Sequence, residues 1–183
     1  MKNKFKIKGE VIEIYVVSPK YGLKTVLIDT EDLNLVSKYN WCVYKKYKKN
    51  YLYCRSTKKP QIGLHRLIMS FPKDKVVDHI NHNTLDNRKE NLRVCINKQN
   101  LRNQKINKNN TSGVKGVSRK IQKINGKIYK YWRSEITYNN KLIHLGLFPY
   151  TEEGKIQAAL RYDEEAKKLF KKYAFLNFSE ENK

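Results

Sequence analysis

The sequence contains few of the residues that build disulfide frameworks, thiolate metal sites or membrane spans. Its 183 residues include three cysteines, Cys42, Cys54 and Cys95, with no C-x-x-C pair. This odd, scattered set argues against a disulfide framework and a structural zinc site, and it favours the reducing cytoplasm. No apolar run is long enough to cross a bilayer, and the first residues, MKNKFKIKGEV, lack the apolar core of a signal peptide. We therefore expect no membrane partner.

Acidic residues are also scarce. Seventeen Asp and Glu stand against 39 Lys and Arg, which gives a formal net charge of +22. The basic residues are spread along the whole length, and this indicates a polyanionic partner. An anionic membrane would usually require a basic amphipathic helix or an apolar anchor, so nucleic acid is favoured. A charge of this size speeds association with DNA and makes the affinity fall steeply as salt rises.

The first part of the chain has mostly strand-like patterning. The stretches EVIEIYVV, KTVLI and NWCVYKKYKKNYLYCRS predict a β-rich region over residues 1–62, and the last of them reads as a hairpin that turns at Lys48 to Asn50. Between the strands, DTEDLNLVSKY predicts a short helix capped by Asp29 or Thr30. IGLHRLIMSF then carries apolar residues at helical spacing.

Residues 106–112 are polar, basic and rich in asparagine, which is typical of a linker, so we divide the chain near residue 106. Beyond it, GVKGVSRK, YWRSEITY and KLIHLGLF predict three short strands, with turn signals at Asn125-Gly126 and Asn139-Asn140. The next stretch predicts an amphipathic helix whose apolar face holds Ile156, Ala159, Leu160, Ala166, Leu169 and Phe170. Three strands and one helix make a compact α+β unit.

The stretch VVDHINHN places Asp78 and His79 side by side at the end of a predicted strand. A second strand over residues 92–96 and a helix beginning at Lys98 follow, and Asn100 comes 22 residues after Asp78. A carboxylate and an amide oxygen that converge there would form a hard oxygen site suited to Mg²⁺. A neutral imidazole beside it can take a proton from water near physiological pH. Together these groups would hydrolyse a phosphodiester.

Two considerations weigh against this hypothesis. Adjacent strand residues point to opposite faces, so Asp78 and His79 cannot both face one cleft from a regular strand, although a twisted or terminating strand would change this. Taken singly, Asp78 and Asn100 also fit turn caps, and His79 fits a packed hairpin residue.

LHRLI and VVDHINHNTLDNRKENLRVCINKQN closely resemble the HNH endonuclease family, especially the free-standing homing endonucleases of phage type. The resemblance implies a ββα-metal fold over residues 63–105. It implies that Asp78 and Asn100 bind one divalent cation, Mg²⁺ or Mn²⁺, and that His79 is the general base. Asn91 would brace the loop through hydrogen bonds without being a ligand.

Three other residues of the motif carry weaker signals. His65 in LHRLI is expected to support the site structurally, by hydrogen bonding between helix and core. Arg66 is a candidate phosphate contact. His82 departs from the family pattern, and we interpret it as a solvated turn histidine, with a DNA contact as the alternative.

The segment from GVKGV through LGLF to LNF, residues 113–178, resembles the Apetala2-type DNA-binding domain. In that family a three-stranded sheet lies in the major groove with the helix packed behind it. Strand alternation places Trp132, Ser134 and Ile136 on one face and polar residues on the other. The predicted DNA contacts are Lys115, Ser118, Lys120, Arg133, Glu135, Thr137 and His144.

We therefore predict an α+β protein: a β-rich region and a ββα-metal nuclease module, then a basic linker and a sheet that reads DNA. The predicted function is metal-dependent endonuclease activity of the HNH homing type, with a nick or a double-strand cut at a preferred site. The alternative is a non-cleaving, sequence-specific DNA-binding regulator, and RNA binding is a weaker third. The expected partner is double-stranded DNA, bound by a monomer or a transient dimer in the cytoplasm of a bacterial or phage-infected cell.

Overall fold

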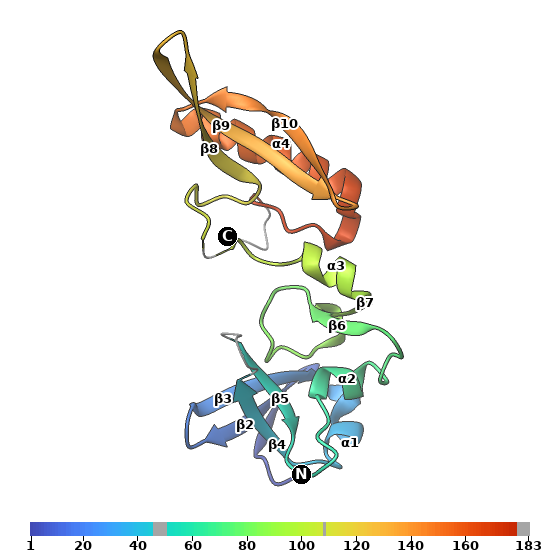
Figure 1. Ribbon diagram of the computed structural model, residues 1–183. Coiled ribbons are helices and arrows are strands. Elements are labelled where there is room, and N and C mark those ends of the chain that lie inside the picture. Colours follow the sequence, from blue (N-terminus) through green and yellow to red (C-terminus); the bar gives the residue numbers. More distant parts are fainter. Residues whose placement is uncertain (46–50, 108, 179–183) are drawn as a thin grey trace. The chain divides into compact units, whose positions relative to one another are not determined.

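The structure, a computed structural model, describes residues 1–45, 51–107 and 109–178. Over these residues it is a mixed α+β protein with several small antiparallel sheets (Figure 1). The chain divides into two compact units, Met1–Asn97 and Lys98–Lys183, and each is described by itself. The predicted hairpin turn at Lys48 to Asn50 lies outside the described residues. Among the helices that the structure describes, none is long and apolar enough to cross a membrane.

The N-terminal unit contains three small sheets, β1-β2-β3, β4-β5 and β6-β7, and short helices. Its elements are β1 (Phe5–Lys8), β2 (Val11–Ser18), β3 (Gly22–Asp29), α1 (Leu33–Val36), β4 (Trp41–Lys45), β5 (Leu52–Ser56), α2 (Leu64–Ile68), β6 (Val76–His79) and β7 (Leu92–Cys95).

Strand alternation forms the core of this unit, as predicted for β2 and β3. Ile12, Ile14 and Val16 of β2 are at most 1% exposed, whereas the residues between them are only partly covered. The buried face packs against α1, α2 and β4 through Val36, Leu64 and other apolar side chains. The sequence reading missed β1, because four exposed residues with alternating lysines give little sign of burial.

The predicted helix after β3 forms differently. A 3₁₀ turn over Thr30–Asp32 leads into the single turn of α1, and neither Asp29 nor Asp32 caps it with its side chain. The Asp29 carboxylate instead accepts a hydrogen bond of 2.7 Å from the backbone N–H of Lys89. The expected cap is therefore wrong, because a contact from 60 residues away occupies the carboxylate.

The second unit contains α3 (Asn97–Arg102, whose first residue precedes the boundary), β8 (Val117–Ile124), β9 (Lys127–Tyr138), β10 (Lys141–Pro149) and α4 (Glu152–Phe170). The antiparallel sheet has the order β10-β9-β8, and α4 packs along one face of it (Figure 1). Both predicted turns are confirmed. The turn residues Asn125, Gly126, Asn139 and Asn140 all have positive φ, as tight hairpin turns require.

The prediction for the buried face of α4 is partly wrong. Ile156 and Leu160 are 47% and 46% exposed, and the buried stripe is built from Ala158, Ala159, Tyr162, Ala166 and Phe170. The face that meets the sheet is therefore centred on small residues and two aromatic rings, and Ile156 and Leu160 lie at its margin. At the start of the helix, a Cβ on Gly154 would lie 2.0 Å from the carbonyl oxygen of Pro149, so only glycine fits there.

Residues near both ends of the second unit pack into it. Ser112, at the end of the predicted linker, is buried and donates a hydrogen bond of 2.8 Å to the carbonyl of Val117. The side-chain oxygen of Asn177 accepts a hydrogen bond of 2.6 Å from the N–H of Lys115. The backbone N–H of Asn177 donates one of 2.9 Å to the Asp163 carboxylate. The predicted LNF motif therefore holds the segment before β8 against α4.

Candidate active site in the β6-β7 hairpin

The hairpin that carries the predicted site pairs β6 with β7 in a regular antiparallel register. Asp78 lies opposite Arg93, and His79 lies opposite Leu92. β6 ends at His79, so the two candidate residues close the strand, and a loop over residues 80–91 follows. The predicted pair of strands is confirmed.

The loop is fixed to the N-terminal sheet by backbone hydrogen bonds. The backbone N–H of Leu27 in β3 donates a hydrogen bond of 2.9 Å to the carbonyl of Leu85, and the N–H of Asn87 donates one of 2.8 Å to the carbonyl of Leu27. Buried Asp86 forms a two-pronged ion pair with Arg88, at 2.8 and 2.7 Å. Burial alone would raise the pKa of Asp86, but the hydrogen bonds from Arg88 outweigh it and hold that pKa below its ordinary value. The loop thus has a rigid support beneath the hairpin.

Asn91 joins the two ends of the loop. Its side-chain oxygen accepts a hydrogen bond of 2.9 Å from the N–H of Asn81, and its side-chain nitrogen donates one of 2.8 Å to the carbonyl of Asp86. Its backbone carbonyl also accepts 2.9 Å from the N–H of Ile80, the residue after His79. Asn91 is 5% exposed. A buried amide with these bonds fixes where the chain leaves His79.

His79 lies in an aromatic and polar pocket. It is 4% exposed, with the rings of His65 and Tyr53 centred 5.4 and 6.4 Å away. Burial lowers the pKa of His79 below that of an ordinary histidine, which keeps the ring neutral near pH 7.

The ring of His79 has a defined partner. Its Nε2 lies 3.3 Å from Oδ1 of Asn87, which is 1% exposed. An amide oxygen only accepts hydrogen bonds, so Nε2 carries the proton in this arrangement. In the neutral ring the lone pair is then on Nδ1, the nitrogen that would act as a base.

Asp78 points to the other face of β6. Its Oδ2 is paired with Arg93 through Nη2 at 2.7 Å and Nε at 3.0 Å, and each side chain is 11% exposed. Val77 and His79 form the more buried face, as period-2 alternation requires. As expected for a regular strand, Asp78 and His79 therefore point to opposite faces of β6 within this hairpin.

The chemistry of Asp78 fits a hard cation. A carboxylate offers about four lone-pair positions, so an arginine on Oδ2 does not exhaust its capacity. Asn100 lies in α3, which is described with the second unit.

A separate acidic cluster, formed by Asp29, Glu31 and Asp32, also has spacing that could suit a metal ion. The ammonium of Lys89 lies 2.5 Å from the Glu31 carboxylate and 3.1 Å from the Asp32 carboxylate. This ammonium already balances the charge of the cluster, so we interpret the cluster as structural.

The structure gives Arg66 and Lys115 local roles. Arg66 donates to the carbonyls of Pro72 and Lys75, both at 3.1 Å, and so fixes the chain after α2. The Lys115 ammonium donates to the carbonyls of Arg102 and Gln104 at 3.0 and 2.6 Å. Burial lowers the pKa of Lys115 to about 8. Both cations are therefore engaged by backbone oxygens.

The other predicted DNA contacts lie on the sheet of the second unit, on the face away from α4. The burial of Trp132, Ser134 and Ile136 confirms the predicted alternation along β9. On the opposite face, Glu135 is paired with Arg133 at 2.9 Å and with His144 at 3.0 Å. The other predicted contacts on this face are Ser118, Lys120 and Thr137. The Ser118 hydroxyl lies 3.3 Å from the Arg133 guanidinium, Lys120 is half-buried and Thr137 is exposed.

Comparisons with known proteins identify the family. The model of the HNH endonuclease family matches residues 64–102. An uncharacterised HNH endonuclease of Acanthamoeba polyphaga mimivirus is 36% identical over 149 residues, which cover 78% of this chain and 69% of that protein. The chain belongs to the HNH endonuclease family. It is therefore a nuclease, and DNA is the substrate that the family implies. HNH nucleases generally use a divalent metal ion.

A second relative of this HNH protein is Protein 3.8 of Escherichia phage T7, which is 37% identical over 70 residues. That match covers 38% of this chain and 53% of the relative, about half its length. No solved structure matches the chain.

The sequence reading did not single out Asn87 or Arg93. Both act through contacts across the hairpin, Asn87 on His79 and Arg93 on Asp78. The contact between Asp78 and Arg93 could have been predicted by aligning the two strands, because opposite charges on facing strand residues attract. Nothing in the sequence around Asn87 indicates that its side chain turns toward His79.

Proposed function

We propose that this HNH endonuclease is a metal-dependent enzyme of the homing type that hydrolyses one phosphodiester bond at a preferred DNA site. The observation that carries the proposal is the family-matched hairpin, where Asp78 and His79 end a strand whose exit is fixed by Asn91. A framework held this firmly limits the positions that the catalytic groups can adopt.

In this proposal His79 is the general base and takes a proton from the attacking water at Nδ1. Asn87 holds the ring through Nε2, and burial keeps the imidazole neutral and able to accept that proton. Asn91 and His65 support the site, Asn91 through the loop and His65 through its ring beside His79.

Asp78 and Asn100 are proposed to hold one divalent cation, with Mg²⁺ and Mn²⁺ both suited to oxygen ligands. The ion would polarise the scissile phosphate and stabilise the departing oxygen. The assignment of Asn100 depends on its family spacing of 22 residues from Asp78. Arg93 would orient the Asp78 carboxylate from the opposite strand.

The second unit is proposed to be an Apetala2-type module that reads DNA with the face of its sheet away from α4. The support is the ion pair of Arg133 and Glu135 on that face, with His144 beside Glu135 and with Ser118, Lys120 and Thr137 around them. Groups held in place by each other contact base edges with little loss of conformational freedom. Arg66 and Lys115 remain proposed phosphate contacts, although backbone carbonyls also engage them.

The proposed division follows the functions: residues 1–62 support the nuclease, 63–105 form it, 106–112 connect, and 113–178 read DNA. Joining two DNA-binding parts raises the effective concentration of the nuclease at DNA that the reader holds. A monomer with one such site would nick its substrate, and a transient dimer would cut both strands.

The test is cleavage of supercoiled plasmid by the full chain in Mg²⁺, in Mn²⁺ and in chelator. We expect nicked or linear product only with metal, and mapping of the ends should give a preferred position. Plasmid that binds the protein but stays supercoiled in all three conditions would favour the non-cleaving regulator.

A further inference from the structure

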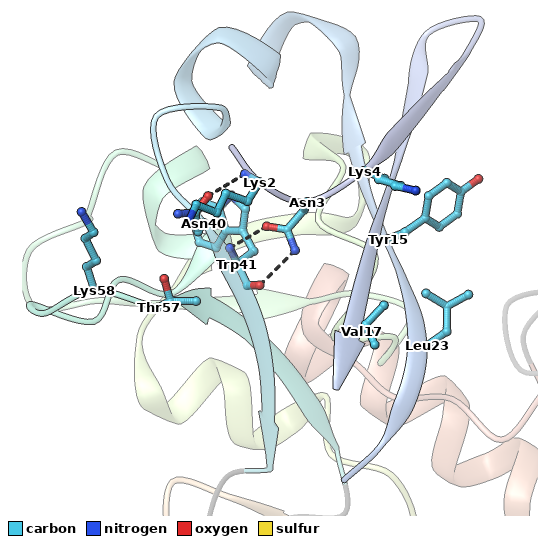
Figure 2. Close-up of a pocket in the computed structure, with 10 residues that line it drawn as sticks. All are labelled: Lys2, Asn3, Lys4, Tyr15, Val17, Leu23, Asn40, Trp41, Thr57 and Lys58. Carbon is cyan, nitrogen blue, oxygen red and sulfur yellow. Dashed lines mark hydrogen bonds between the residues drawn. The ribbon is translucent and has the colours of Figure 1, made fainter. Parts of the chain in front are cut away.

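The N-terminal unit has a groove on the side of the β1-β2-β3 sheet, with a volume of about 860 Å³ (Figure 2). Its floor includes Val17 and Leu23, which lie side by side in Figure 2 and face each other in the register of β2 and β3. They are 78% and 60% exposed and together form a small exposed apolar patch. The lysines Lys2, Lys4 and Lys58 also line the groove.

Two of the lysines are positioned by the chain before β1. The Asn3 side chain donates 3.1 Å to the carbonyl of Trp41 and accepts 2.8 Å from its N–H. The backbone N–H of Lys2 donates 2.6 Å to the Asn40 side chain. These bonds hold Asn3 in place, and its two neighbours, Lys2 and Lys4, line the same groove.

The next feature is the charge of these lysines. Within the described part of the chain, the ammonium groups of Lys2, Lys4 and Lys58 have no ion pair. The nearby acid on the same sheet face, Glu13, is occupied by Lys8 at 2.7 Å and by the Tyr15 hydroxyl at 2.8 Å. The positive potential of the groove is therefore not cancelled locally.

The charge of the whole unit has the same sign. Residues 1–97 contain 20 Lys and Arg against nine Asp and Glu, a formal net charge of +11. A polyanion would thus be drawn to this unit irrespective of the second one. Among polyanions, duplex DNA presents both regularly spaced phosphates for the lysines and apolar sugar faces for Val17 and Leu23.

We propose that this groove is a DNA-binding surface of the N-terminal unit, in which Lys2, Lys4 and Lys58 contact phosphates of duplex DNA and Val17 and Leu23 contact its sugars. The unit is then a part of the enzyme that holds substrate as well as a support for the hairpin. The proposal rests on the proposed function for its ligand, DNA, and it does not depend on cleavage.

The test measures the salt dependence of binding to a short duplex by fluorescence anisotropy, in chelator so that nothing is cut. The full chain is compared with the triple variant K2Q/K4Q/K58Q. Each lost phosphate contact lowers the slope of log K against log salt by about 0.9, so the triple variant should lose about 2.7. The arginine triple K2R/K4R/K58R should keep the wild-type slope.

The matched control is K20Q/K38Q/K73Q, which removes the same charge from exposed lysines of this unit outside the groove. Its slope should stay within about half a unit of wild type. Equal losses in the two glutamine triples would overturn the proposal, as would no loss in the groove triple. A wild-type chain that binds duplex DNA with the expected slopes but never cuts would refute the nuclease mechanism and leave this surface standing.

Discussion

Replacing Asn87 by leucine separates catalysis from stability. The Asn87 side chain makes one hydrogen bond within the described residues, the 3.3 Å contact to Nε2 of His79, and its buried Nδ2 has no partner there. A bond of this kind contributes about 0.5–1.5 kcal/mol net, and removing an unsatisfied buried amide group offsets part of that loss. Asn87→Leu also leaves the buried Nε2–H of His79 without this acceptor, which costs about 1–3 kcal/mol, so we expect the free energy of unfolding to fall by no more than about 3 kcal/mol.

The effect on cleavage is measured separately, on the folded variant. Without an acceptor at Nε2, the His79 ring loses the hydrogen bond that favours a proton on Nε2. The tautomer with its proton on Nδ1, the proposed basic nitrogen, then becomes more populated. Loss of a partner that orients a metal-bound histidine typically costs 10- to 100-fold, and we expect a fall of the same order in the single-turnover rate when the proposed general base loses its partner. Asn87→Asp keeps an oxygen at the same position and should recover most of the rate.

The direct readout is the ¹⁵N spectrum of the His79 ring, with His79→Ala used to assign the signals. Wild type and Asn87→Asp should show Nε2 protonated, and Asn87→Leu should show a mixture of tautomers. Wild-type cleavage by Asn87→Leu, or protonation of Nδ1 in the neutral wild-type ring, would refute the reasoning.

Three further predictions concern the second unit. Gly116→Ala should destabilise it by more than about 3 kcal/mol in thermal unfolding, because φ is +76° and the new Cβ would lie 1.9 Å from the Tyr162 ring. Asp163→Ala should cost about 3 kcal/mol, since the carboxylate accepts from the N–H groups of Asn177 and Phe178; a change below 1 kcal/mol would contradict the role. The pKa of Lys115, lowered to about 8, means that the unfolded chain binds more protons than the folded one between pH 8 and 10.5. Wild-type stability should thus gain a rising contribution with pH in that window, measured by denaturant titration, and Lys115→Met should remove it.

Local patterning predicted the elements that depend on near neighbours. The alternation of Trp132, Ser134 and Ile136 along β9 and the tight turn at Asn125-Gly126 follow from side-chain direction and backbone preference alone. The β6-β7 hairpin was predicted for the same reason.

Contacts between distant segments could not be read in this way. The loop residues Leu85 and Asn87 pair with Leu27, nearly 60 positions earlier, and this pairing brings Asn87 into contact with His79. Likewise, the position of Lys115 in the sequence did not indicate that its ammonium donates to the backbone carbonyls of Arg102 and Gln104. A side chain's partner depends on the fold, so residue type alone does not identify it.

The central claim is that Asp78 and His79 carry out metal-dependent DNA cleavage. The most direct measurement compares plasmid cleavage and duplex binding by wild type, Asp78→Asn and His79→Ala in Mg²⁺. We predict that both variants fold and bind DNA as wild type does but lose at least about 100-fold in cleavage rate, as expected when a general base or a metal ligand is removed. Cleavage by His79→Ala at the wild-type rate would contradict the assignment of the base, and with it the proposed mechanism.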